Sequence, residues 1–297
     1  MIKKYIAPSL LFLWSLSAAH PLNIDQTPSP QLLELLKITG VQHDGTLKGI
    51  VDGTQKVWVR STDKELWQVQ DVFKDKRDQI IPLLEDMGCL KSIAPTKKYY
   101  HYAVILGSPI RVIRSRLAFL IKQWDAGVRF EQIIFLAGQR SLDPVQESEA
   151  VLINQTSAEQ YVRPDWKLVG SLPTTETEAA KVAYQQATLS LGMEKIQVTF
   201  IDAPCQKTES GLTKRPSRAD TIDQWLKTNP APGSCLCISG QPFCLYDDSI
   251  VSSLLPLGFV VETVGQEANP QLALASHLDT LARYLYSQYH KHHFSGR

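Results

Sequence analysis

From residue 101 onward, short apolar runs alternate with segments whose apolar residues recur at helical spacing. Five such runs have the length and composition of buried strands: YAVILG, QIIFLAG, IQVTFIDA, CLCIS and GFVVETVG. Strands that alternate with helices of ten or more residues are typical of βα units, in which helices cover both faces of a parallel sheet. We therefore predict a three-layer, doubly wound α/β domain with a mostly parallel sheet over residues 101–297.

The helices that follow these strands are expected at residues 109–126, 144–153, 219–227 and 248–255. A final helix is expected where leucines repeat at helical spacing: Leu274, Leu278, Leu281 and Leu285. Ser108 is a favourable N-cap residue and Pro109 suits the first helical position, so the first helix is expected to begin there.

Residues 20–100 have a more mixed pattern, which predicts a small α+β extension or a separate N-terminal subdomain. An apolar helix is expected at residues 32–38, and a longer helical stretch is expected to end near Met87 and Gly88. Between them, the alternation in LKGIVDGTQKVWVR suggests a hairpin. The sequence leaves open whether this region is independent of the main domain.

The first 19 residues have the pattern of a cleaved secretory signal peptide. Lys3 and Lys4 precede an apolar run at residues 6–16, and Ser17, Ala18 and Ala19 supply the small residues of a cleavage site. The alternative is an uncleaved anchor, but the run is shorter than the roughly 20 residues that a spanning helix needs. We expect a periplasmic or secreted protein with no transmembrane segment after cleavage.

Composition is consistent with one large globular domain plus an extension: 297 residues, of which 43% are hydrophobic and 21% charged. The formal net charge of +1 does not suggest a nucleic-acid partner. The chain has five cysteines, an odd number with no disulfide-framework spacing. Cys235 and Cys237 are expected to share one face of a strand as buried thiols, while a disulfide from Cys244 is left open.

Ligands of open α/β sheets bind beyond the carboxyl ends of the strands, so the loops that follow the strands are the candidate sites. The first loop contains Gly107 and Ser108, and the next helical turns carry Arg111 and Arg114. Cations are unfavourable at a helix N-terminus, and a bound phosphate or carboxylate could relieve that misfit. The alternative is that both arginines pair with acidic residues of a neighbouring loop or lie in solvent.

Two strands end in the same dipeptide, Gly-Gln, followed by different chemistry. Gly138 and Gln139 lead to Arg140, whereas Gly240 and Gln241 lead to a proline and a phenylalanine. Because parallel strands place their carboxyl ends at one edge, we expect Gln139 and Gln241 to face one crevice with Arg111 opposite. A further candidate is Thr175, which has the capping-box spacing to Glu178.

The order of several short segments resembles the envelope-associated SanA/YdcF/ElyC-like family, a domain of unknown function with a Rossmann-like fold. The segments are VILGSPIRVIRSRLAF, IIFLAGQR, ESEAVL, PTTETEAA and CISGQPF, and together they span roughly residues 101–265. Gln139 stands where the family has a second glycine, and the late His-x-x-Arg element is missing. The resemblance implies an envelope role and a small-ligand pocket, and it suggests Glu178 or Glu149 as a general base.

Two functions follow from these expectations. The first is an exported protein that binds or processes an anionic envelope metabolite, such as a sugar phosphate, a lipid-linked sugar or a nucleotide derivative. The second is a non-catalytic binding or interaction protein in which the pocket is vestigial. Whether the chain is an enzyme is left open, and its protein partners are unknown. No cofactor and no metal site are predicted, although His290, His292 and His293 lie close together near the C-terminus.

Overall fold

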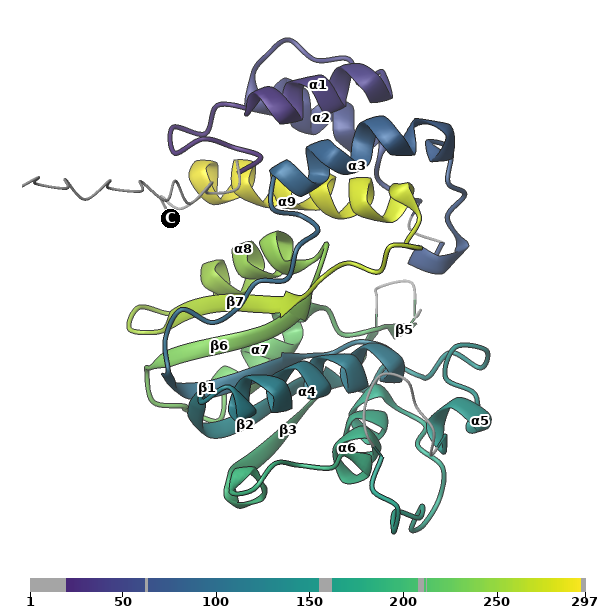
Figure 1. Cartoon of the computed structure of the whole chain (residues 1–297), viewed down its shortest axis with the longest axis vertical. Helices are drawn as coiled ribbons and strands as arrows, with labels where there is room; N and C mark the ends of the chain where they lie inside the picture. The colour runs from purple at the N-terminus through teal and green to yellow at the C-terminus, as the bar shows by residue number, and fades with distance from the viewer. Residues whose placement is uncertain (1–19, 62–63, 155–161, 208–210, 212, 295–297) are drawn as a thin grey trace, which may run out of the picture.

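The computed structural model describes residues 20–61, 64–154, 162–207, 211 and 213–294. The predicted signal peptide, residues 1–19, lies outside these ranges. The centre of the fold is a five-stranded parallel sheet in the order β3-β2-β1-β6-β7 (Figure 1). Its strands are β1 (Tyr99–Leu106), β2 (Arg129–Gly138), β3 (Gln197–Ala203), β6 (Ser234–Gly240) and β7 (Val260–Gln266). The predicted three-layer α/β fold is confirmed.

The strand order reverses next to β1. The chain runs outward from β1 through β2 to β3, then returns to build β6 and β7 on the other side of β1. In doubly wound sheets, the loops at such a reversal diverge to opposite faces and leave a crevice at the carboxyl ends of the two strands. This topology places the expected ligand crevice beyond β1 and β6.

Helices cover both faces of the sheet because the strands are apolar on both sides. In β1, Ala103 and Ile105 pack under α4 (Ile110–Asp125) and α6 (Glu176–Gln186). Val104 and Leu106 point the other way, toward α7 (Arg218–Leu226) and α8 (Cys244–Leu254). Successive strand residues face opposite sides, so a nearly continuous apolar run fills both interfaces.

A separate helical layer joins the two ends of the chain. It comprises α1 (Pro30–Thr39), α2 (Leu47–Val57), α3 (Arg77–Asp86) and α9 (Leu274–Phe294). Leu274, Leu278, Leu281 and Leu285 of α9 share one apolar core with these N-terminal helices. Figure 1 shows this layer beyond the β7 edge of the sheet, with α8 between the two. The C-terminal helix therefore belongs structurally with residues 20–100, across the predicted boundary at residue 100.

Short elements complete the described chain. They are the 3-10 helices η1 (Leu66–Gln68), η2 (Lys74–Lys76) and η3 (Met193–Lys195), the helix α5 (Glu149–Leu152), and the two-residue strands β4 (Gln206–Lys207) and β5 (Thr213–Lys214). β4 and β5 pair with each other in an antiparallel ladder.

The prediction of a hairpin in LKGIVDGTQKVWVR is wrong, because residues 47–57 of this segment form α2. Thr46 caps the helix by accepting a hydrogen bond from the backbone nitrogen of Gly49, and Ile50, Val51 and Thr54 are buried at helical spacing. A Cβ on Gly53 would lie 2.4 Å from the carbonyl oxygen of Gln42. This glycine therefore serves close packing rather than a turn.

Three helix starts differ from the expected ones. α4 begins at Ile110, with Pro109 rather than Ser108 at the N-cap position and no side-chain cap from it. The helix expected at residues 144–153 is reduced to the single turn of α5. α8 starts four residues earlier than expected, at Cys244. At the start of α4, a tertiary hydrogen bond from the backbone N–H of Ile110 to Glu147 stands in place of the expected side-chain cap.

All five cysteines are described, and all are free thiols. Cys235 and Cys237 are buried on the face of β6 that packs under α7 and α8, as predicted. Cys244 is also buried and forms no disulfide. Among the described residues, no helix combines the length and apolarity that crossing a membrane requires.

Candidate functional site

The loop that follows β2 divides the carboxyl edge of the sheet into two compartments. Residues 139–142 run antiparallel to residues 174–176: Glu176 donates its backbone N–H to the oxygen of Arg140 at 2.9 Å, and Ser141 pairs with Thr175. Neighbouring residues of such a ladder point to opposite sides. Arg140 and Glu176 consequently face one compartment, and Ser141 and Thr175 face the other.

The first compartment holds six charged side chains, which we call the charge cluster: Arg116, Arg140, Glu147, Glu176, Arg218 and Asp247. The most accessible of them, Arg218, has a side chain that is 25% exposed. Charged groups are costly to bury unless they are paired, and strongly perturbed ionisable groups concentrate at functional sites. The cluster lies at the carboxyl ends of β2, β1 and β6, where this topology predicts a ligand crevice.

Glu147 is the internal anion of the cluster. One carboxylate oxygen accepts the backbone N–H of Ile110 at 3.0 Å, and the other accepts the backbone N–H of Asp143 at 3.0 Å. Arg140 binds both oxygens, at 2.8 and 3.2 Å. The negative charge that the N-terminus of α4 favours is thus supplied by the chain itself, from a residue that is 3% exposed.

Asp247 organises the opposite wall. Its side chain is fully buried and accepts a hydrogen bond from the hydroxyl of Ser239 at 2.6 Å. Arg218 lies 2.5 Å from one carboxylate oxygen, and Arg116 lies 3.8 Å from the other. Arg116 also donates to the carbonyl oxygen of Leu106 at 2.6 Å, which is the last residue of β1. Arg116 and Asp247 therefore connect the carboxyl ends of β1 and β6, where the strand order reverses.

Glu176 is the most perturbed carboxyl of the cluster. It is 8% exposed, and burial raises its pKa to about 7, with further contributions from the nearby Glu147 and opposing ones from Arg140. A Cβ on Gly107 would lie 2.8 Å from Oε1 of Glu176, so the glycine is what allows the carboxyl to approach the end of β1. Near neutral pH this carboxyl can both give and take a proton.

The second compartment is a polar pocket of about 520 Å³ over the ends of β2 and β3. Hydroxyl, amide and charged groups dominate its lining: Gln139, Ser141, Thr175, Thr177, Glu178, Lys181, Asp202, Cys205 and Thr213. Asp202 accepts hydrogen bonds from Gln139 at 3.0 Å and from Thr177 at 2.7 Å. The loop that carries Thr213 continues to Arg215 and Arg218, so it borders both compartments.

The two arginines expected to hold an anion behave differently. Arg114 is 1% exposed and donates to Oε1 of Gln186 and to the carbonyl oxygens of Val151 and Leu152 at 2.7–3.0 Å. Its charge is therefore compensated by internal acceptors that tie α4 to α5 and α6, and it does not face the carboxyl-edge compartments. Arg111 lies exposed in the first turn of α4, and its proposed anion role stays a prediction.

Gln139 and Gln241 do not converge on one crevice. Gln139 points toward β3 and binds Asp202. Gln241 is 6% exposed and donates to the carbonyl oxygens of Gly88 and Lys91 at 2.8 and 3.0 Å, so it fastens β6 to the segment after α3. The second Gly-Gln dipeptide therefore has a structural role, because Gln241 binds the N-terminal extension rather than facing a crevice.

Of the remaining predicted residues, Thr175 and Glu178 line the polar pocket, whereas Glu149 and Ser108 do not. Thr175 and Glu178 form the capping box of α6, and bonds from Thr174 and Thr175 lower the pKa of Glu178. Both residues also line the polar pocket. Glu149 is exposed on α5, outside the pocket lining, and Ser108 is half-buried before α4.

The predicted glycines differ in what they contact. A Cβ on Gly138 would meet Pro216 at 2.4 Å, whereas one on Gly240 would make an ordinary contact with Gln266 at 3.8 Å. Gly138 therefore lets the loop before α7 pass closely over the end of β2, which brings Arg215 and Arg218 to the carboxyl edge.

Sequence reasoning missed most of the charge cluster: Arg116, Glu147, Glu176 and Asp247 were not singled out. Arg215 and Arg218 could be noticed because they stand close together in RPSRADT. Glu176 had a weaker signal, since it lies inside a capping box whose spacing directs attention to Glu178. Its burial depends on Gly107, which is distant in the sequence.

No protein-family model matches the chain, and a search of curated proteins found no match. In the described part of the chain, no three His, Cys, Asp or Glu side chains are grouped in a way that could hold a metal ion.

Proposed function

We propose that the carboxyl edge of the sheet binds a small anionic metabolite that also carries hydroxyl groups, such as a sugar phosphate, and that Glu176 exchanges a proton with it. Glu176 carries the proposal: a buried carboxyl with a pKa raised to about 7, at the edge where doubly wound sheets bind ligands. A group that titrates near the working pH is suited to general acid or base catalysis.

The two compartments would serve different parts of such a ligand. The polar pocket offers hydroxyl and amide partners, among them Ser141, Thr177 and Gln139, to the hydroxyl groups of a sugar. Arg215 and Arg218, whose side chains are 55% and 25% exposed, supply the guanidinium groups that recognise phosphate. One loop carries both arginines and Thr213, which lines the polar pocket, so we propose that the phosphate of a ligand in this pocket lies beside that loop.

The cellular location and the envelope role that we propose rest on the sequence. The basic and apolar N-terminal segment supports export, and the motif resemblance supports a role in the cell envelope. We therefore propose an exported protein that binds or processes an anionic envelope metabolite.

A non-catalytic binding protein is the second candidate, and one observation favours it. Arg116, Arg140 and Arg218 each already face a carboxylate: Asp247 for the first and third, Glu147 for the second. An arginine whose charge is compensated contributes less to stabilising new negative charge in a transition state. Such a cluster can position a ligand without transforming it.

Calorimetric titration with glucose 1-phosphate tests the proposal, with glucose and inorganic phosphate as partial ligands. The intact ligand should bind at least about tenfold more tightly than either part. Arg215→Gln should weaken binding, while Lys227→Gln, which removes an exposed cation at the far end of α7, should not.

Phosphate release separates the two candidates. Release that disappears in Glu176→Gln while binding persists supports processing, and binding without release supports the non-catalytic candidate. The absence of saturable binding to the wild-type protein would contradict both.

A further inference from the structure

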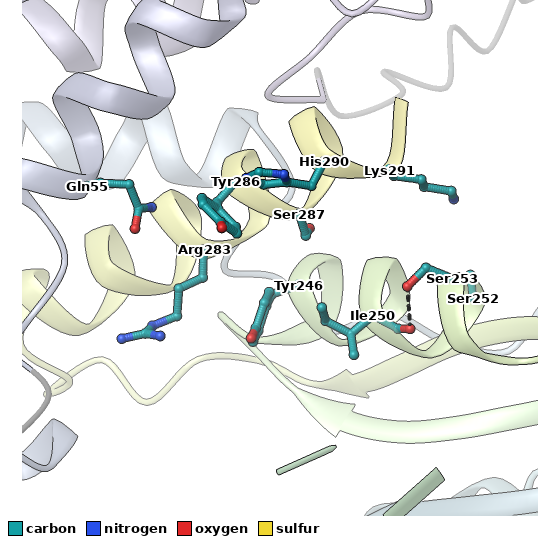
Figure 2. Close-up of a pocket in the computed structure, with 10 residues that line it drawn as sticks. All are labelled: Gln55, Tyr246, Ile250, Ser252, Ser253, Arg283, Tyr286, Ser287, His290 and Lys291. Carbon is teal, nitrogen blue, oxygen red and sulfur yellow. Dashed lines mark hydrogen bonds between the residues drawn. The ribbon is translucent and has the colours of Figure 1, made fainter. Parts of the chain in front are cut away.

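A second cavity lies outside the carboxyl-edge site, in a groove between α8 and α9. Its volume is about 700 Å³, and Gln55 of α2 closes one side. Figure 2 shows the α9 side chains on one wall, including Arg283 and Tyr286, and those of α8 on the other, including Tyr246 and Ile250. The groove and the polar pocket have no lining residue in common. Its volume falls in the range of small-molecule sites.

The charge of the groove has one sign. Arg283 and Lys291 line it together with His290, and none of its described lining residues is acidic. A lining that carries cationic but no acidic side chains favours an anionic occupant, because opposite charges attract more strongly in a partly enclosed site than in bulk water. Behind the wall, Asp279 is the one carboxylate among the described residues that pairs with Arg283, and it is shared with Arg60.

Arg283 is held in position from beneath. Asp279, one helical turn earlier and 2% exposed, accepts from Nε and Nη2 of Arg283 at 2.8 and 3.2 Å. Arg60 fixes the same carboxylate at 2.6 Å. Across the described residues, the remaining nitrogen, Nη1 of Arg283, has no hydrogen-bond partner. A guanidinium that is oriented by a buried acid and keeps a donor available is suited to an incoming anion.

The walls also offer apolar surface. Tyr246 and Ile250 extend from α8, and Tyr286, which is 46% exposed, extends from α9. Exposed aromatic side chains at a groove supply contact area at low cost in conformational entropy. An occupant therefore needs an apolar part as well as an anionic group.

The spacing along α9 sets the length of the groove. Arg283, Ser287 and Lys291 are four residues apart and lie on one stripe of the helix, which spans about 12 Å at 1.5 Å per residue. Lys291 lies in the last turn of α9, where the helix dipole favours a cation. Arg283 lies well before that turn, so the helix dipole does not explain its position.

We infer that the groove between α8 and α9 binds an organic anion whose phosphate or carboxylate meets Arg283 and whose apolar body packs between Tyr246 and Tyr286. This inference is independent of the proposed function, because it concerns different residues.

Calorimetric titration of the full chain with 1-naphthyl phosphate tests the inference, with 1-naphthoate, 1-naphthol and inorganic phosphate as comparison probes. Both naphthyl anions should bind, and 1-naphthol and inorganic phosphate should bind at least about tenfold more weakly, since each lacks one half of the recognised chemistry. A phosphate preference or a carboxylate preference between the two anions then identifies the anionic group.

Variants locate the site. Ser253→Glu adds a negative charge to the α8 wall at an exposed position, and Arg283→Gln removes the positioned cation. Each should weaken binding of 1-naphthyl phosphate by about tenfold or more, the size of one charge-assisted hydrogen bond. Lys56→Gln, which removes a neighbouring exposed cation of α2 outside the groove, should change it by less than about twofold.

Three results would overturn the inference: no saturable binding to the wild-type protein, wild-type affinity in Ser253→Glu, or weakening by Arg215→Gln instead. The last result would mean that the probe binds at the carboxyl edge rather than in the groove. Because Ser253→Glu removes no tertiary hydrogen bond, it keeps the test valid if Arg283→Gln does not fold.

Discussion

Oε2 of Glu176 lies 3.9 Å from Nε of Arg140, and both residues face the same side of the ladder between residues 139–142 and 174–176. Burial raises the pKa of this carboxyl, and the arginine opposes the rise without cancelling it. The pair therefore places a group that titrates near neutral pH at the reversal point of the sheet. This relationship has consequences for stability as well as for ligand binding.

Glu176→Gln should change how stability depends on pH. A pKa raised from 4.5 to about 7 means that the folded chain holds a proton that the unfolded chain has released. The stabilisation from Glu176 is thus complete below about pH 4.5 and is lost as the pH rises through about 7. Between about pH 5 and pH 8, the variant should gain about 2 to 3 kcal/mol of unfolding free energy relative to the wild type.

Urea denaturation of both proteins at the two pH values measures this difference. Glu178→Gln is the matched control, because hydrogen bonds from Thr174 and Thr175 lower the pKa of Glu178. Its contribution is present above the unfolded pKa, so this variant should lose stability at both pH values. An unfolding free energy of Glu176→Gln that parallels that of the wild type across this range would refute the raised pKa.

Replacing Glu147 should destabilise the fold strongly. Its carboxylate binds Arg140 and two backbone N–H groups while 3% exposed, so Glu147→Ala leaves a guanidinium and two donors without their acceptor. Breaking a buried ion pair of this kind costs about 3 kcal/mol or more. Glu149→Ala, at an exposed position two residues later, should cost less than about 1 kcal/mol. Equal losses in denaturation experiments would contradict the capping role of Glu147.

Substitutions of Arg114 and Arg111 should lower the free energy of unfolding by different amounts in the same denaturation assay. Arg114→Met keeps the length of the side chain but removes the donors to Oε1 of Gln186 and to the carbonyl oxygen of Val151, and one of the two donors to that of Leu152, so we expect a loss of about 3 kcal/mol. Arg111→Met is at an exposed position of the same helix and should cost less than about 1 kcal/mol. A stable Arg114→Met protein would show that its internal bonds contribute little.

Thiol labelling of the native protein should find one accessible cysteine. Cys205 is partly exposed at the polar pocket, whereas burial raises the pKa of Cys89, Cys235 and Cys244 to about 12 and also raises that of Cys237. A thiolate-specific reagent should therefore modify Cys205 first, and the other four should react after unfolding. Fast labelling that survives Cys205→Ser would contradict the buried placement of the others.

Much of the fold could be predicted because it depends on local patterns. The apolar runs of β1, β2 and β6 and the leucine spacing of α9 are visible in single segments. The segment of α2 is wrongly predicted as a hairpin because its apolar and polar residues alternate locally, whereas Gly53 lets the helix approach the carbonyl oxygen of Gln42. Close packing between distant segments leaves no local signal.

The site was harder to predict for the same reason. The loop rule points to the carboxyl edge and to Gln139, Arg140 and Thr175, which the structure places in the polar pocket or the charge cluster. It could not show that Arg114 turns inward to Gln186, or that Gln241 binds the segment after α3. Nor could it show that Glu176 is buried against Gly107. These outcomes depend on which distant backbone groups need partners.

The titration of Glu176 by carbon-13 NMR tests the central claim most directly. Its side-chain carboxyl signal can be assigned by its absence in Glu176→Gln, and followed with and without glucose 1-phosphate. We expect a midpoint near pH 7 in the free protein and a displaced midpoint when the ligand is bound. A midpoint near 4.5 that glucose 1-phosphate leaves unchanged would contradict the account.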